Sequence, residues 1–130
     1  MSQYEHSLIA MKRLLDAVGE THWADWIHRD IEDWRSKRST FHHLSAYGGM
    51  GSFTDVWICR ANHNEVSKAQ EPWVNTLFGL LQSICYYLAQ HPKKSLAAKT
   101  LSKVVGGHGS ALAAFLGGDA APNSMKGYAN

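Results

Sequence analysis

The sequence has little of what staples a secreted protein or anchors a membrane protein. Its 130 residues include only two cysteines, Cys59 and Cys85, which lie in apolar runs without paired spacing. We therefore predict two buried, reduced thiols rather than a disulfide. The first residues lack the basic start and apolar core of a signal peptide, and no apolar segment reaches the roughly 20 residues needed to cross a bilayer. These absences predict a cytoplasmic protein without membrane contact.

The sequence also lacks an excess of one charge. Thirteen lysines and arginines oppose eleven aspartates and glutamates, a formal net charge of +2, and the two signs alternate along the chain. Binding to nucleic acid needs basic residues massed on one face, so we expect no nucleic-acid partner. The hydrophobic fraction of 45% and the charged fraction of 18% are typical of a globular domain with one core.

Helical periodicity covers most of the first half of the chain. A capping box from Ser2 to Glu5 predicts the start of a first helix, and Gly19 is suited to end it in the left-handed conformation. A second helix begins at Thr21, and a short one is expected over residues 41–47. The second helix carries one apolar stripe, made of Trp23, Ile27, Ile31 and Trp34. We expect its tryptophans to form the main core wedge, the alternative being that one stays exposed as a binding anchor.

The strongest helical pattern begins at Trp73 and ends before His91-Pro92. It is apolar over much of its circumference, which predicts the central helix of the bundle. A fifth, weaker helix is expected from Ser95 to Val105. The sequence thus predicts an all-α fold, a compact bundle of four to five helices. It also predicts a single helical domain over residues 1–116 and a flexible C-terminal tail over residues 117–130.

Three glycines interrupt this pattern in the run Gly48-Gly49-Met50-Gly51-Ser52, and they predict a rigid corner at the surface. The residues from Phe53 to Arg60 favour strand formation, yet no other segment resembles a partner strand. Two interpretations stay open. Either Ser52 caps a helical turn, which an acid at Asp55 slightly favours, or the segment is one short strand paired with a loop or another chain.

The residues around the corner offer little support for chemistry. A phosphate-binding loop would need a lysine that is missing here, and neither a G-x-G-x-x-G pattern nor a βαβ frame surrounds the glycines. His42 and His43 are adjacent and so point to different faces of a helix, which disfavours a shared metal. We therefore predict no enzyme activity, no cofactor and no metal. The alternative is a small enzyme, or an anion- or nucleotide-binding protein, that uses the turn from Gly48 to Ser52.

The run from His43 to Val56 resembles the signature of a family of small, uncharacterised bacterial proteins. That signature is a helix end followed by Gly-Gly-Met-Gly-Ser, an apolar residue, a polar residue that is usually asparagine, an aspartate and an apolar residue. Thr54 stands here in place of the asparagine. The resemblance extends from the first helix to the fourth, and its specific part is the turn.

Such proteins are similar in size and class to the immunity proteins that bacteria encode beside antibacterial toxins. The resemblance implies a cytosolic helical protein that binds its cognate toxin and occludes the toxin's active site. The corner would then enter or cover the toxin's cleft, with Asp55 as the polar anchor and Trp57 as the aromatic anchor. The full predicted partner-binding set is Gly49, Met50, Gly51, Ser52, Asp55 and Trp57. A homodimeric structural protein joined through a tryptophan face is a further alternative.

Overall fold

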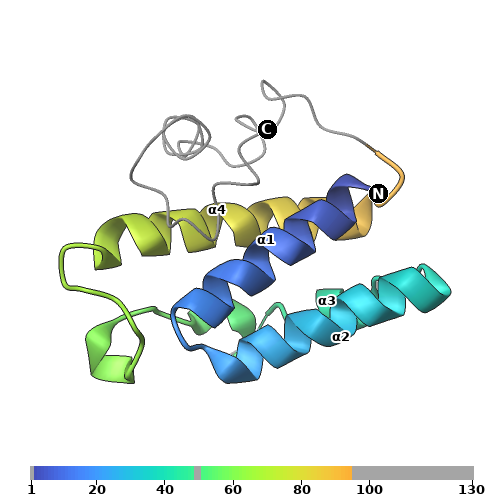
Figure 1. The fold of residues 1–130 in the computed structure, drawn as a ribbon. Coiled ribbons are helices and arrows are strands. Elements are labelled where there is room, and N and C mark those ends of the chain that lie inside the picture. The colour runs from blue at the N-terminus through green and yellow to red at the C-terminus, as the bar shows by residue number, and fades with distance from the viewer. Residues whose placement is uncertain (1, 49–50, 95–130) are drawn as a thin grey trace.

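The computed structural model describes residues 2–48 and 51–94. Within these residues the chain forms four α-helices and two short 3-10 turns and has no strand, so the predicted all-α fold is confirmed (Figure 1). The elements are α1 (Gln3–Ala17), α2 (Thr21–Lys37), α3 (Phe41–Leu44), η1 (Phe53–Asp55), η2 (Arg60–Asn62) and α4 (Glu71–Gln90). The predicted fifth helix from Ser95 and the predicted tail over residues 117–130 lie outside the described residues.

The long helix α1 packs against both α2 and α4, and the short α3 contacts α2 and α4 (Figure 1). This arrangement places the core between the three long helices, because each turns an apolar stripe inward. The largest fully buried side chains are Tyr4, Leu8, Met11, Leu14, Leu15, Ile27, Phe53, Ile58, Phe78, Leu80 and Leu88. Among the described residues, no helix combines the length and the apolar character that crossing a membrane requires.

Only one of the two hydrogen bonds of the predicted capping box forms at the start of α1. The Ser2 hydroxyl accepts a hydrogen bond from the Glu5 amide at 3.1 Å. The Glu5 carboxylate does not complete the box but accepts from the Arg35 guanidinium of α2, at 3.1 and 3.2 Å. Because Glu5 is used to join two helices, the first turn of α1 is tied to the last turn of α2. Gly19, which follows the end of α1, is in the left-handed region with φ of 74°, as predicted.

The short α3 ends three residues before its predicted end at Tyr47. After Leu44 the chain tightens, since the Ala46 amide donates to the His43 carbonyl at 3.0 Å instead of continuing the α-helical pattern. Gly48 follows with φ of 88°, a conformation that excludes further helix. The turn therefore begins earlier than the glycines themselves.

Residues 53–60 are neither a continuous helix nor a paired strand. They begin as the single turn η1, continue in extended conformation and enter η2. The predicted side-chain cap at Ser52 is wrong: its hydroxyl makes no capping bond and lies 2.7 Å from the Thr54 hydroxyl. The extended backbone therefore needs other partners, which α4 supplies.

Helix α4 begins two residues earlier than predicted, with Pro72 in its first turn, where the missing amide proton is tolerated. A capping box from Ser67 to Gln70 forms one turn ahead of the helix. Its two bonds join the Gln70 amide to the Ser67 hydroxyl at 3.2 Å and the Ser67 amide to the Gln70 side chain at 2.9 Å. The helix ends at Gln90, two residues before Pro92, as expected from the proline.

Candidate functional site

Residues 53–60 run antiparallel along α4, and side chains of α4 bind their backbone. We call these residues the α4-bound segment. Near its start, the Gln82 side-chain amide donates to the Phe53 carbonyl at 2.8 Å. At its end, the Glu71 carboxylate accepts from the Arg60 amide at 2.9 Å. Two bonds eleven residues apart on one helix thus hold both ends of the segment.

Between these ends, the Asn75 side chain takes the place of a neighbouring strand. Its oxygen accepts from the Ile58 amide at 2.9 Å and its nitrogen donates to the Ile58 carbonyl at 2.7 Å. The same nitrogen also lies 2.9 Å from the Glu71 carbonyl. Asn75 and Ile58 are both buried, so an unpaired backbone here would be costly. One side-chain amide therefore explains how an extended segment exists without a β-sheet.

Phe53 fixes the segment to the core. Its side chain is fully buried, and its ring contacts three aromatic rings from three other parts of the chain. The ring centroids lie 4.8 Å from Trp23, 5.3 Å from Phe78 and 5.8 Å from Tyr47. Aromatic packing of this kind adds to the area that each ring buries. The segment is consequently anchored by packing as well as by hydrogen bonds.

The predicted binding residues are partly described. Gly49 and Met50 lie outside the described residues. Gly51 and Asp55 are exposed and Ser52 is half-buried, and the Gly51 amide donates to the Asp55 carboxylate at 2.8 Å. The protein's own carboxylate therefore occupies an amide that an anion would need, and its negative charge repels a second anion. This contact disfavours the alternative of an anion site at the turn.

Trp57 of the α4-bound segment is 59% exposed. The other large exposed apolar side chains among the described residues are Phe41 at 80% and Tyr86 at 40%. The tryptophans of α2 behave as the core wedge that the sequence predicts: Trp34 is buried, and Trp23 and Trp26 are partly buried against the core. A tryptophan side chain that stays in solvent on a fixed backbone is a potential binding anchor.

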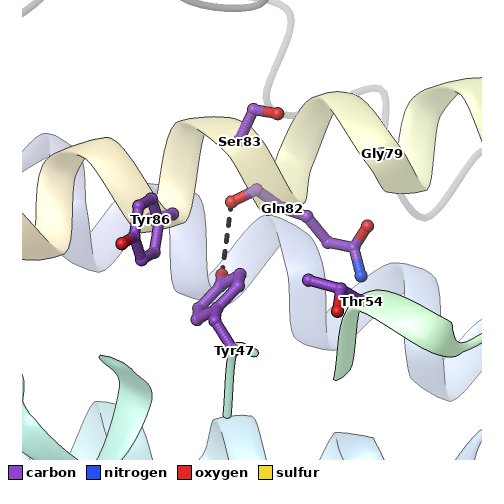
Figure 2. Close-up of a pocket in the computed structure, with 6 residues that line it drawn as sticks. All are labelled: Tyr47, Thr54, Gly79, Gln82, Ser83 and Tyr86. Atoms are coloured by element: carbon purple, nitrogen blue, oxygen red, sulfur yellow. Dashed lines mark hydrogen bonds between the residues drawn. The ribbon is translucent and has the colours of Figure 1, made fainter. Parts of the chain in front are cut away.

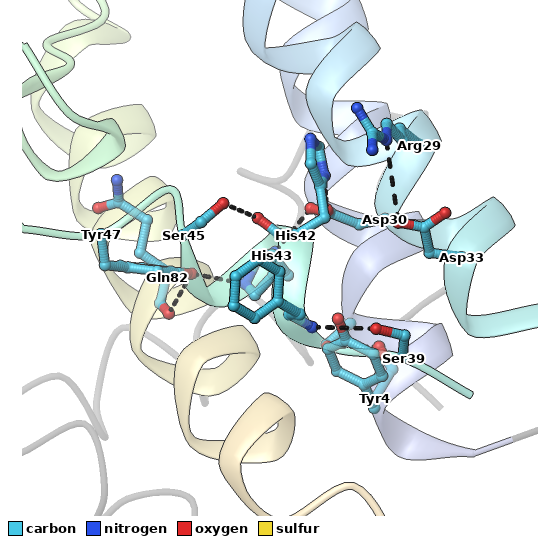
Figure 3. A network of polar contacts seen from close by, with 12 residues as sticks. Tyr4, Arg29, Asp30, Asp33, Ser39, His42, His43, Ser45, Tyr47 and Gln82 are labelled. Atoms are coloured by element: carbon cyan, nitrogen blue, oxygen red, sulfur yellow. Dashed lines mark hydrogen bonds and ion pairs between the residues drawn. The ribbon is translucent and has the colours of Figure 1, made fainter. Parts of the chain in front are cut away.

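A buried polar cluster lies on the other side of the turn (Figure 3). Asp30 of α2 is 1% exposed, and its two carboxylate oxygens face two histidines of α3. His42 Nδ1 lies 2.5 Å from one oxygen, and His43 Nδ1 lies 2.8 Å from the other. His42 also stacks on the Trp26 ring with centroids 4.1 Å apart. One carboxylate thus fixes the orientation of both imidazole rings.

The cluster continues from His43 to α4. His43 is fully buried, and its Nε2 lies 2.8 Å from the Tyr47 hydroxyl. That hydroxyl donates to the Gln82 carbonyl at 3.2 Å (Figures 2 and 3). Helices α2, α3 and α4 are therefore joined by a continuous polar chain that passes directly before the glycine corner. Although adjacent residues of a helix are expected to point to different faces, the Nδ1 atoms of His42 and His43 converge on one carboxylate. Among residues 2–48 and 51–94, no three potential ligand side chains gather as a metal site.

A shallow pocket of about 320 Å³ lies between Tyr47, the α4-bound segment and α4 (Figure 2). A side chain at Gly79 would meet nothing within 4 Å there. Its lining residues are Tyr47, Thr54, Gly79, Gln82, Ser83 and Tyr86. None of them carries a charge, so the pocket lining offers no ion-pair partner for a phosphate or a carboxylate.

Burial raises the pKa of three acidic groups around this cluster. It raises the pKa of the Cys85 thiol to about 12 and moves the pKa values of Tyr4 and Tyr47 well above their ordinary value of 10.0. The cause is the loss of solvation of the charged forms, to which nearby acidic groups add. All three groups therefore stay protonated in the folded protein at neutral pH.

These shifts predict that the protein loses stability at alkaline pH. In the unfolded chain Cys85 ionises near 9.0 and the tyrosines near 10.0, whereas the folded state retains the protons. The unfolded state then binds fewer protons, so the free energy of unfolding falls as pH rises. Each group contributes a loss of up to about 1.4 kcal/mol per pH unit above its unfolded pKa.

The measurement is the urea unfolding midpoint at several pH values above about 8. The midpoint should fall, and a Cys85→Ala variant should lack the part of the fall that begins near 9.0. A midpoint that stays constant until the tyrosines ionise in the wild-type protein would contradict the contribution of Cys85.

The comparison with known protein families gives one match. Residues 16–67 match a domain of unknown function (DUF6966). The matched part runs from the end of α1 to the loop before α4, and it contains the glycine corner, the α4-bound segment and the Asp30–His42–His43 cluster. No curated protein and no solved structure matches the chain. Over less than half of its length, the chain is similar to DUF6966.

Proposed function

We propose that this chain is a cytoplasmic, non-catalytic binding protein, and that its partner is a cognate bacterial toxin. The toxin class rests on the resemblance in size and class to immunity proteins, which is an analogy rather than a motif. The mechanism is steric: the glycine corner and the α4-bound segment cover the toxin's cleft, so that substrate cannot enter.

The observation that carries the proposal is the exposed Trp57 on a backbone that is already fixed. Its 59% exposure leaves a large aromatic surface in solvent, and the next residue, Ile58, is held by both bonds to Asn75. A side chain on a preorganised backbone loses little conformational freedom when it binds, so more of the contact energy becomes affinity. Aromatic residues in such positions are frequent hot spots.

Asp55 complements this anchor. Its carboxylate is exposed and one of its oxygens is held by the Gly51 amide, so its direction is fixed as well. A fixed charge beside an aromatic side chain favours a partner with a basic group near an apolar pocket. This arrangement supports protein recognition better than small-molecule binding.

The test is the affinity for a toxin encoded beside this gene. Trp57→Ala should weaken binding about 30-fold, which corresponds to the roughly 2 kcal/mol of a hot spot. Phe41→Ala is the matched control, because it removes an aromatic side chain that is 80% exposed but lies outside the corner and the segment. Its affinity should stay within about twofold of the wild-type value.

Two results would contradict the proposal. One is full toxicity in cells that co-express the neighbouring toxin with this protein. The other is an equal loss of affinity in the Trp57→Ala and Phe41→Ala variants. Sedimentation distinguishes the homodimer alternative, since a dimer joined through Trp57 would have twice the mass of 14.5 kDa and Trp57→Ala would halve it.

A further inference from the structure

The contacts of Tyr47 place a constraint on the protons of His43. A tyrosine hydroxyl has one proton. The Gln82 group it contacts is a backbone carbonyl, which can only accept, so the hydroxyl must donate to it. The Tyr47 oxygen then faces His43 Nε2, 2.8 Å away, with its lone pairs. For this contact to be a hydrogen bond, Nε2 must carry a proton.

The other ring nitrogen is constrained in the same way. His43 Nδ1 lies 2.8 Å from the Asp30 carboxylate, and an ionised carboxylate only accepts. With the Tyr47 proton directed to the Gln82 carbonyl, both nitrogens of His43 donate, and this arrangement requires the imidazolium form. The charge is balanced locally, because Asp30 and His43 form an ion pair in which both side chains are fully shielded from solvent. A buried carboxylate without such a partner would carry a large desolvation cost.

We propose that His43 is held as an imidazolium whose two protons bridge Asp30 and Tyr47, and that this ring is a proton-dependent latch between α2 and α4. When His43 loses its Nε2 proton, that nitrogen becomes an acceptor. The single proton of Tyr47 then turns to Nε2, and its bond to the Gln82 carbonyl is lost. The protonation of one buried ring thus controls a contact with α4 at the residue whose side chain also holds Phe53.

The other groups around the His43 ring neither carry its positive charge nor balance it, so the charge belongs to the Asp30–His43 pair. His42 of α3 shares the carboxylate. A neutral His42 ring can donate its single proton from Nδ1 to Asp30, so this contact does not require His42 to be charged. Tyr4 of α1 meets the His43 ring edge-on at 6.0 Å between centroids. Cys85 of α4 lies close enough to Tyr47 and Tyr4 to interact with both. Tyr4 and Cys85 stay protonated and uncharged, so Asp30 is the anion that balances His43.

The experiment is nuclear magnetic resonance of the full chain with ¹⁵N-labelled histidine at neutral pH. Long-range ¹H–¹⁵N spectra distinguish protonated from unprotonated ring nitrogens. We expect both nitrogens of His43 to be protonated, and His42 to have protonated Nδ1 and unprotonated Nε2. Single His42→Gln and His43→Gln variants assign the signals among the eight histidines. An unprotonated Nε2 on His43, or a positive charge on His42 in its place, would overturn the proposal.

Raising the pH tests the latch itself. The step that removes the Nε2 proton should shift the backbone signals of α4 around Gln82 in the wild-type protein. In a Tyr47→Phe variant, which keeps the ring and removes the hydroxyl, the histidine step should no longer shift those α4 signals. If the wild-type and Tyr47→Phe signals of α4 shift equally, the latch is disproved. This outcome is independent of toxin binding, because no partner is present in the sample.

Discussion

Replacement of Asp30 by alanine is expected to lower the free energy of unfolding by about 3–5 kcal/mol, the range for removing one partner of a buried ion pair. The change leaves two imidazole rings without their shared acceptor. His43 is fully buried, so water cannot replace the lost carboxylate. The measurement is urea unfolding followed by tryptophan fluorescence, with the slope of the transition used to confirm that the folded state stays compact.

Asp33→Ala is the matched control for Asp30→Ala. Asp33 is another aspartate of α2, one turn further along, and its carboxylate lies 3.9 Å from the largely exposed Arg29 guanidinium. A pair of this kind contributes at most about 1 kcal/mol. If both alanine variants unfold at similar urea concentrations, the cluster contributes no more than a surface contact, and the interpretation of Asp30 as its centre is wrong.

The three long helices could be predicted from the sequence because one physical signal determines them. The apolar spacing in α1, α2 and α4 buries a stripe in each case, and the ends follow local chemistry at Ser2, Gly19 and Pro92. The errors in these elements are confined to a few residues at the ends, where the bonds of the cap rather than the stripe decide the boundary.

A hydrogen-bonded histidine beside the turn could be expected from the sequence, but Asp30 as the centre of the polar cluster was missed although the sequence contains a signal for it. Asp30 lies three residues after Ile27 and four before Trp34, so on a helix it falls on the apolar face. A carboxylate there must find a partner. The apolar spacing of α2 does not identify the partner of this carboxylate. His42 and His43 reach Asp30 only because α3 folds back over α2. That return depends on tertiary packing.

The α4-bound segment was also predictable only in part, because its partner is distant in the sequence. Its strand-like composition correctly indicates an extended backbone, but the partner is a side chain of a helix rather than a strand. No local pattern around Ile58 indicates this. The signal lies in α4, where Asn75 is a polar residue one turn before Phe78 on a largely apolar helix. The part of the predicted binding surface that lies in this segment is thus held by α4, which is distant in the sequence.

Replacement of Asn75 by leucine tests that support and should lower the free energy of unfolding by about 2–4 kcal/mol. Leucine has the same branching and number of side-chain heavy atoms as asparagine, and its larger methyl groups replace the amide oxygen and nitrogen. The change removes the acceptor of the Ile58 amide and the donor of the Ile58 carbonyl. Each buried backbone group left without a partner costs about 1–3 kcal/mol. The exchange of the Ile58 amide proton with solvent should accelerate in the same variant, because opening the segment then requires less free energy.

Thr76→Val is the control, since it is nearly isosteric and removes one side-chain bond of the next residue of α4, to the Pro72 carbonyl. That threonine's hydroxyl bonds within α4, so the free energy of unfolding of the Thr76→Val variant should stay within about 0.5 kcal/mol of wild type. If Asn75→Leu instead leaves the Ile58 amide protected, the segment holds its shape through Phe53 and the core alone. If Ile58 exchanges faster while α1 and α2 stay protected, Asn75 governs the local order of the backbone beside Trp57. The affinity for the proposed toxin partner should then fall in that variant without any change to a surface residue.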